Sequence, residues 1–230
     1  MCERYALPEQ IVTEREFAPA KTWWKFTARF NVGARQYVPA IRLHERQSEA
    51  VMLQWGLIPA WAEGRLDAEP PRRISGSDIG RSAMHREPWM KGQRCILPIA
   101  GFYVWQLTAA RYRQPYFVRL IDRPVIGLAG IWDRSVADDD DVIESFSLIC
   151  VPASELLQQI VNTEPLMPAI LERSDYDTWL RGTPVEARGA LRSCDSASMQ
   201  AYPVSPRVNS LSADDEGLIR PTQLRPLVAV

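Results

Sequence analysis

The chain has 230 residues, of which 46% are hydrophobic and 24% charged, and its formal net charge is −1. This length suits one large domain, which buries enough surface to fold without cross-links. We find no run of 18 apolar residues and no signal or lipidation motif, so the composition argues against a membrane protein. We expect one domain over residues 1–230, cytoplasmic, with an extended tail over 210–230.

Alternating apolar and polar residues, separated by turn residues, predict that most of the chain forms strands. The expected strands cover residues 23–30, 37–43, 50–57, 94–99, 102–105, 115–121, 125–132 and 145–151. Helical spacing and capping residues predict helices over residues 8–18, 83–90, 153–161, 173–181 and 185–192. These elements predict an α+β fold with a curved, barrel-like, mainly antiparallel sheet and a few peripheral helices.

Residues 63–80 form a polar stretch with two prolines and three glycines, which predicts a long loop. Structureless stretches of this length in a compact domain are usually functional or mobile. Arg72, Arg73, Arg81 and Arg86 lie in this loop or just after it. We expect them to give this part of the molecule a positive potential.

The four cysteines are Cys2, Cys95, Cys150 and Cys194, and no pair has CxxC spacing. With only two histidines in the chain, this pattern predicts neither a metal site nor a disulfide framework, and we expect no cofactor. Cys95 and Cys150 lie in apolar runs, which predicts that both are buried as small hydrophobic side chains.

All but three of the 27 basic residues are arginine, and the chain has eight tryptophans. The planar guanidinium binds phosphate through two hydrogen bonds and stacks on bases, so this composition is compatible with nucleic acid. A GC-rich coding sequence would produce the same arginine bias. Composition alone leaves both explanations open.

The chain begins Met1-Cys2-Glu3-Arg4. If Met1 is removed, Cys2 carries an α-amine and a thiol on adjacent carbons, and both keep a reactive fraction near neutral pH. Such a pair can capture an aldehyde, because the amine forms a Schiff base and the thiol then closes a five-membered ring. The alternative is that position 2 holds a cysteine of no functional importance.

Seven stretches along the chain together resemble one family. They are residues 1–6 (MCERYA), 29–32 (RFNV), 55–61 (WGLIPAW), 94–105 (RCILP and GFYVW), 167–171 (MPAIL), 179–180 (WL) and 203–209 (PVS and VN). In this order they resemble the SOS-response-associated peptidase family of abasic-site processing proteins. The resemblance implies a protein of the DNA damage response that binds single-stranded DNA at an abasic site and crosslinks to it through Cys2 as a thiazolidine.

The chain departs from the family at four positions that the resemblance marks as functional. Ser75 and Ser77 stand where the family loop has asparagine and arginine, Val104 stands where it has glutamate, and Glu164 stands where it has histidine. Valine carries no proton, so any acid–base role at position 104 is lost. Three roles for Glu164 remain open. It replaces the histidine as a proton carrier, it stands in for the missing glutamate and faces the Cys2 amine from the other side of the pocket, or it is a surface carboxylate before Pro165.

Three further residues match the family and are candidate DNA contacts. Arg4 suits a phosphate, although a structural salt bridge would use it equally well. Asn31 lies in the Phe-Asn-Val stretch, and Trp61 is placed to wedge against unstacked bases or to pack in the core. With Ser75 and Ser77 these residues form the expected DNA-binding set.

Three functions remain open at this stage. The first is an active abasic-site processing protein with Cys2 as nucleophile and Glu164 as acid–base group, which the resemblance places among hydrolase- or lyase-like enzymes. The alternative is a degenerate member that binds single-stranded DNA without crosslinking or crosslink reversal. The third is a peptidase that removes its own leader. We expect a monomer, associated with the nucleoid when it is bound to DNA.

Overall fold

The structure, a computed structural model, describes residues 3–66 and 68–222. The helices are α1 (Gln10–Phe17), α2 (Arg86–Met90), α3 (Glu155–Ile160), α4 (Tyr176–Arg181) and α5 (Pro184–Gly189). The strands are β1 (Tyr5–Leu7), β2 (Lys21–Thr22), β3 (Arg29–Val32), β4 (Tyr37–His44), β5 (Gln47–Trp55), β6 (Arg73–Ser75), β7 (Arg94–Ile99), β8 (Gly101–Leu107), β9 (Arg113–Leu120), β10 (Ile126–Val136), β11 (Val142–Pro152), β12 (Leu166–Pro168), β13 (Ile170–Leu171) and β14 (Met199–Pro203). None of the helices in these ranges is long and apolar enough to cross a membrane.

Five strands close into a barrel in the order β11, β10, β7, β4 and β5. All neighbours in this ring are antiparallel except β5 and β11, which close it through the parallel pairs Gln54 with Ser145 and Trp55 with Phe146. The β4–β5 hairpin turns at Glu45 and Arg46, which both have positive φ. A two-residue turn needs positive φ at both positions if its twist is to match that of the strands. The predicted α+β fold with a barrel-like sheet is confirmed.

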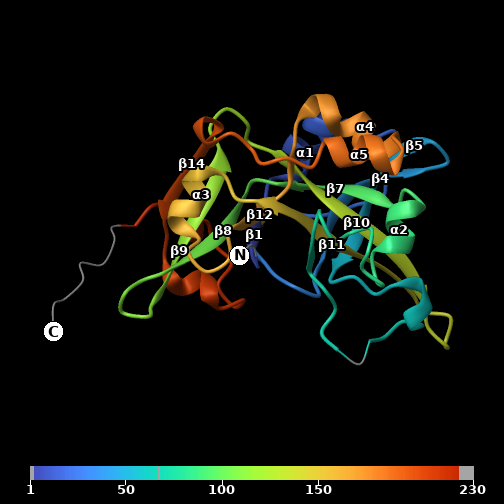
Figure 1. Cartoon of the computed structure of the whole chain (residues 1–230), viewed down its shortest axis with the longest axis horizontal. Helices are drawn as coiled ribbons and strands as arrows, with labels where there is room; N and C mark the ends of the chain where they lie inside the picture. Colours follow the sequence, from blue (N-terminus) through green and yellow to red (C-terminus); the bar gives the residue numbers. More distant parts are fainter. Residues whose placement is uncertain (1–2, 67, 223–230) are drawn as a thin grey trace.

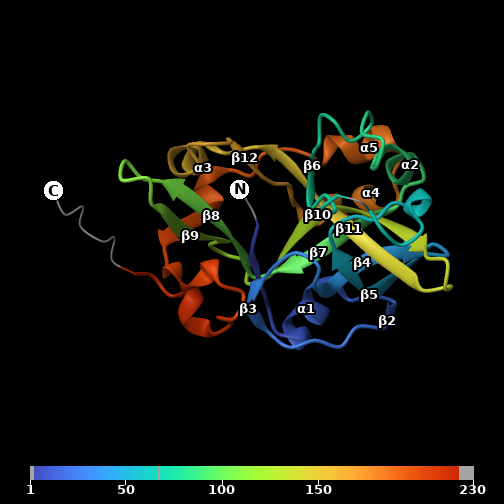
Figure 2. The same cartoon turned by 90° about the horizontal axis from the view of Figure 1, so that it is seen from below.

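A second, five-stranded antiparallel sheet has the order β14, β9, β8, β1 and β3. Figures 1 and 2 show β8 and β9 with α3 on one side of the molecule and the barrel strands on the other. At Gly101, where β8 begins, an added Cβ would lie 2.4 Å from the Phe117 ring and 2.5 Å from the Val118 carbonyl oxygen. Only glycine allows this close approach between β8 and β9.

The core has two parts. The larger cluster extends from the barrel strands to one face of the second sheet and includes Trp55, Phe146 and Val104. The smaller one lies on the other face of the second sheet and includes Tyr103 and Phe117. Strand β12 pairs with β11 at residues 150–152, next to the point where β6 pairs with it at residues 148–150.

Three segments differ from the sequence-based expectation. Residues 23–28 are not strand, because Trp24 turns inward and donates its indole N–H to Glu14 at 3.1 Å. The expected loop over 63–80 contains β6, paired with β11 in parallel. Of the expected tail, residues 210–222 include a 3-10 turn at Glu216–Ile219, and residues 223–230 lie outside the described residues.

Candidate functional site

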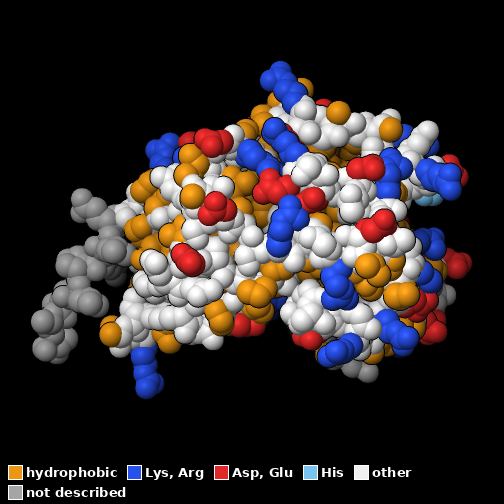
Figure 3. Space-filling model, turned by 45° about the horizontal axis from the view of Figure 1, so that its top comes forward, with side chains coloured by type: hydrophobic (Ala, Val, Ile, Leu, Met, Phe, Trp, Pro, Cys, Tyr) orange, Lys and Arg blue, Asp and Glu red, His pale blue; other side chains and the backbone are white. Residues whose placement is uncertain are grey.

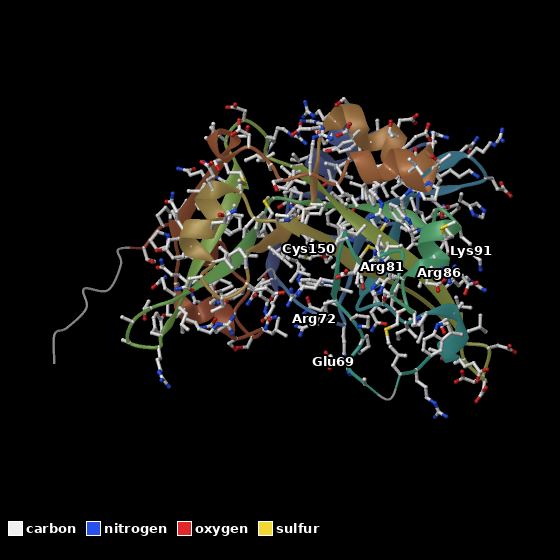
Figure 4. All side chains as sticks on the ribbon, viewed as in Figure 1. Glu69, Arg72, Arg81, Arg86, Lys91 and Cys150 are labelled. Atoms are coloured by element: carbon white, nitrogen blue, oxygen red, sulfur yellow. The ribbon has the colours of Figure 1, made fainter. Side chains whose placement is uncertain are left out.

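A pocket of about 470 Å³ opens between the loop before β6, the strand β11 and the turn before β12. We call it the front pocket. It is lined by residues 69–75 and by Asp78, Cys150, Glu164 and Leu166. Figure 4 shows Cys150 and Arg72 near the middle of the front view, with Glu69 below them.

An ion pair between Arg73 and Glu164 lies at this pocket. The two guanidinium Nη atoms donate to the two carboxylate oxygens, each at 3.1 Å, so the contact is bidentate. The side chains remain 34% and 47% exposed, respectively. Burial alone would lower the pKa of Arg73, but the hydrogen bonds and charge of Glu164 outweigh burial and raise it. Glu164 therefore lines the pocket and also contacts solvent.

Ser75 and Ser77 lie at the end of β6. Their hydroxyl groups are 2.8 Å apart, and Ser77 donates to the Asp78 carboxylate at 3.2 Å. Ser75 lines the front pocket next to Cys150, its strand partner on β11. The pair offers neutral hydrogen-bonding groups where the family resemblance implies an amide and a cation.

The start of the described chain lies near the front pocket. Glu3 and Arg4 line a neighbouring pocket of about 240 Å³ together with Trp105, Arg113 and Asn209. Burial lowers the pKa of Arg4; the negative charge of Glu3 opposes this effect and the positive charge of Arg72 adds to it. Arg72 itself lines the front pocket, so its charge reaches both sites. Cys2 lies outside the described residues.

Asn31 is fully buried on β3. Its side-chain amide donates to the carbonyl oxygens of Val208, Ser210 and Ala213 at 3.2, 2.8 and 2.8 Å. Asp214 accepts the Asn31 backbone N–H at 3.0 Å. These contacts hold residues 208–214 against β3, so the structure gives Asn31 an anchoring role within the fold.

Trp61 is 56% exposed on the 3-10 turn Ala60–Ala62. The turn lies at the right-hand edge of Figures 1 and 2, away from β1. The backbone N–H of Ala60 donates to Asp133 on β10 at 2.8 Å, which holds the turn against the barrel. Trp61 is thus accessible, but it does not line the front pocket.

Val104 is fully buried on β8, within the larger apolar cluster. Its neighbours Tyr103 and Trp105 belong to the smaller cluster on the other face of the sheet. The alternation of a strand places position 104 among apolar side chains. No proton carrier stands there.

His85, at the start of α2, fixes the loop that forms the pocket wall. The Ser147 hydroxyl donates to the Pro71 carbonyl at 2.5 Å, so it accepts the hydrogen of His85 Nε2 at 3.0 Å. Ser82 then donates to His85 Nδ1 at 2.8 Å. Burial lowers the pKa of His85 to about 4, which keeps the imidazole neutral.

Cys95 and Cys150 are buried, as predicted. Burial raises the pKa of the Cys150 thiol to about 11, and nearby Arg73 only partly opposes this.

Within residues 3–66 and 68–222, no group of His, Cys, Asp or Glu side chains could hold a metal ion. Basic and acidic side chains lie beside one another over the face in Figure 3, which is hollowed between the two lobes at its lower edge.

Arg73 has no specific role that the sequence predicts, although it is the cation of the front pocket that is paired with Glu164. Of the four arginines near the loop, Arg72 and Arg73 line the pocket. Arg81 and Arg86 lie to the right of Cys150 in Figure 4. Arg73 was one of several equivalent arginines in the sequence, and only its pairing with a residue 91 positions away distinguishes it.

The sequence model of the SOS response associated peptidase (SRAP) family matches residues 1–211, and the chain belongs to this family as a divergent member.

Similar proteins carry informative names. The abasic site processing protein YoqW of Bacillus subtilis (strain 168) is 24% identical over 214 residues, which cover 92% of this chain and 90% of YoqW. The abasic site processing protein HMCES of Gallus gallus is 26% identical over 233 residues, covering 87% of this chain and 68% of HMCES. A crystal structure of a protein from Bacteroides thetaiotaomicron matches with a TM-score of 0.86 and 25% identity, covering 96% of this chain and all of that one.

Proposed function

We propose that this protein recognises abasic sites in single-stranded DNA and, once Met1 is removed, links to them through Cys2 as part of the DNA damage response. Family membership and the names of the relatives support this proposal. The observation that carries it is the front pocket, where Arg72, Arg73 and Ser75 offer phosphate-binding groups close to the start of the chain. The protein would act as a monomer at the nucleoid.

The covalent step needs no cofactor. The Cys2 amine attacks the aldehyde carbon of the open deoxyribose, and water leaves as the imine forms. The Cys2 sulfur then adds to the imine carbon and closes the five-membered ring, while the thiol proton passes to the nitrogen. All atoms come from Cys2 and the sugar, with water as the leaving group.

Glu164 is the proposed proton carrier for these steps. It is a carboxylate at the front pocket, and Val104 cannot serve in its place. A carboxylate accepts the amine proton during imine formation and returns a proton to the departing oxygen. The candidate DNA contacts that remain are Arg4, Trp61, Ser75 and Ser77, of which Ser75 lines the same pocket as Glu164. Asn31 is fully buried and anchors residues 208–214, so it is no longer a candidate DNA contact.

A second candidate function is DNA binding without crosslinking. The observation in its favour is that Arg73 donates a hydrogen bond to each oxygen of Glu164, so both oxygens are paired with a charged group. A carboxylate held in this way is a poorer proton carrier than the histidine of the family. The same pocket would then bind an abasic strand without reacting with it.

The deciding experiment is an intact mass spectrum of the protein before and after incubation with single-stranded DNA that carries one abasic site. We expect a chain without Met1 and an adduct mass that is lost in Cys2→Ala. Cys150→Ala is the matched control, since Cys150 is a thiol at the same pocket, and it should keep the adduct. DNA binding without any adduct would favour the second function, and neither binding nor adduct would refute both.

A further inference from the structure

We propose that the Arg73 guanidinium is the phosphate-binding group of the front pocket, and that Glu164 occupies it until a DNA phosphodiester displaces the carboxylate. This inference rests on the proposed function and names the part of the DNA that the pocket binds. It also gives Glu164 a second task, as an internal competitor of the DNA.

The geometry of the ion pair supports the exchange. Arg73 presents two parallel N–H donors to two oxygens at equal distances of 3.1 Å. A phosphodiester offers two unesterified oxygens that fit the same planar donor pair, which is why arginine binds both groups in bidentate fashion. A phosphate in place of the carboxylate would satisfy the same two donors.

Because the pair is exposed, separating Arg73 from Glu164 costs little free energy. Both side chains are about a third to a half exposed, at 34% for Arg73 and 47% for Glu164. Ion pairs in such surroundings contribute little stability, because water screens the charges and replaces the partner readily. The contact with Glu164 that an incoming phosphate has to break is therefore weak.

The backbone holds Arg73 in place during the exchange. Arg73 lies opposite Leu148 in the parallel pairing of β6 with β11, and the Leu148 N–H donates to the Arg72 carbonyl at 2.9 Å. In the exchange, the side chain of Glu164 moves away from its place in the turn before β12. Arg72 lines the same pocket and adds a second positive charge.

The other acidic side chains of the pocket have partners outside this exchange. Glu69 accepts from Arg35 at 3.3 Å, and Asp78 accepts from Ser77 at 3.2 Å. Glu164 is thus the carboxylate in the pocket lining that is paired with Arg73. Its displacement would release a carboxylate at the pocket only when DNA is present, which couples binding to proton transfer.

The test measures the affinity of the full chain for intact single-stranded DNA, which has no aldehyde and so reports binding alone. We expect Glu164→Gln to bind about two- to fivefold more tightly, because the neutral amide competes less for the guanidinium. We expect Arg73→Gln to bind about tenfold more weakly, since it loses two charge-assisted hydrogen bonds. It should also reduce the slope of log affinity against log salt by about 0.7.

The opposite signs distinguish an exchangeable phosphate site from an ion pair that merely supports the fold. The matched control is Glu16→Gln, which neutralises a carboxylate that binds Arg173 through both oxygens and does not line the front pocket. Its affinity for DNA should equal that of the unaltered chain. Weaker binding by Glu164→Gln, or an unchanged affinity in both pocket variants, would overturn the inference.

The result also separates this inference from the proposed function. If the unaltered chain binds DNA and forms the Cys2 adduct but the two pocket variants shift affinity in the same direction, only the exchange is wrong. If the unaltered chain binds no single-stranded DNA, the proposed function fails and the exchange fails with it.

Discussion

Two arginine–carboxylate clusters in this protein differ in how much water reaches them. Arg42 on β4 binds Glu49 on β5 and Glu144 on β11, both at 2.7 Å, and its side chain is 10% exposed. Arg73 on β6 binds Glu164 at 3.1 Å, and its side chain is 34% exposed. The first cluster lies within the closed barrel and the second at the edge of a pocket.

The difference shows that similar ion pairs serve different purposes according to their surroundings. Burial acts to lower the pKa of Arg42, yet the hydrogen bonds and charges of Glu144 and Glu49 outweigh burial and raise it. The guanidinium also lies 4.2 Å from the ring centre of Trp132 on β10, so the cluster links four strands of the barrel. Such a group cannot be exchanged without breaking the fold, whereas the Arg73 pair can change partners.

The largest effect is expected from Arg42→Met, which leaves two carboxylates close together without their cation. We expect the free energy of unfolding to fall by about 3–5 kcal/mol. Denaturant titration of the purified variant would measure this change. The double variant Arg42→Met/Glu49→Leu should recover part of the loss, because one buried carboxylate is removed as well. A single variant as stable as the unaltered chain would contradict the structural role of the buried cluster.

An intermediate effect is expected from acidification, through His85. Its pKa is about 4 in the folded chain against 6.5 for an ordinary histidine, so the unfolded chain binds a proton in this range that the folded chain does not. Neutral His85 therefore contributes fully to the free energy of unfolding above pH 6.5. This contribution, about 3 kcal/mol, is lost as the pH drops from 6.5 towards 4. Unfolding measured across that range should show a flatter pH dependence for His85→Gln. Identical slopes would exclude the assignment.

The smallest effect on stability is expected at the pocket. Arg73→Gln should change the free energy of unfolding by less than about 1 kcal/mol, since water already solvates much of the pair. The same denaturant titration as for Arg42→Met provides the comparison. A loss as large as that of Arg42→Met would mean that the exposed pair supports the fold and is not free to exchange.

Much of the fold could be predicted from the sequence because its strands are long and locally patterned. The alternation over residues 37–43 and 50–57 identified β4 and β5, and the apolar run at 94–99 identified β7. The strand predicted from the aromatic run at 23–30 was wrong over residues 23–28, because Trp24 packs against Phe26 and Glu14 and this segment pairs with no strand.

The candidate site was less predictable, because its contacts join distant parts of the chain. β6 is three residues long and pairs with a strand more than 70 positions later, so no local pattern marks it. Glu164 departs from the family motif in the sequence, but nothing in the sequence indicates its partner. Arg73 becomes distinct only when the fold brings the turn before β12 against β6.

The hydroxyl of Ser147, which joins His85 to the Pro71 carbonyl, has a consequence for ligand binding. It fixes the segment that leads into β6 during folding, so the conformational entropy of that segment is lost before any ligand arrives. A ligand that binds at the front pocket therefore does not have to order this segment of backbone. Less of the free energy of its contacts is then offset by lost entropy, and the affinity is higher. One buried serine on β11 thereby preorganises an arginine at the front pocket.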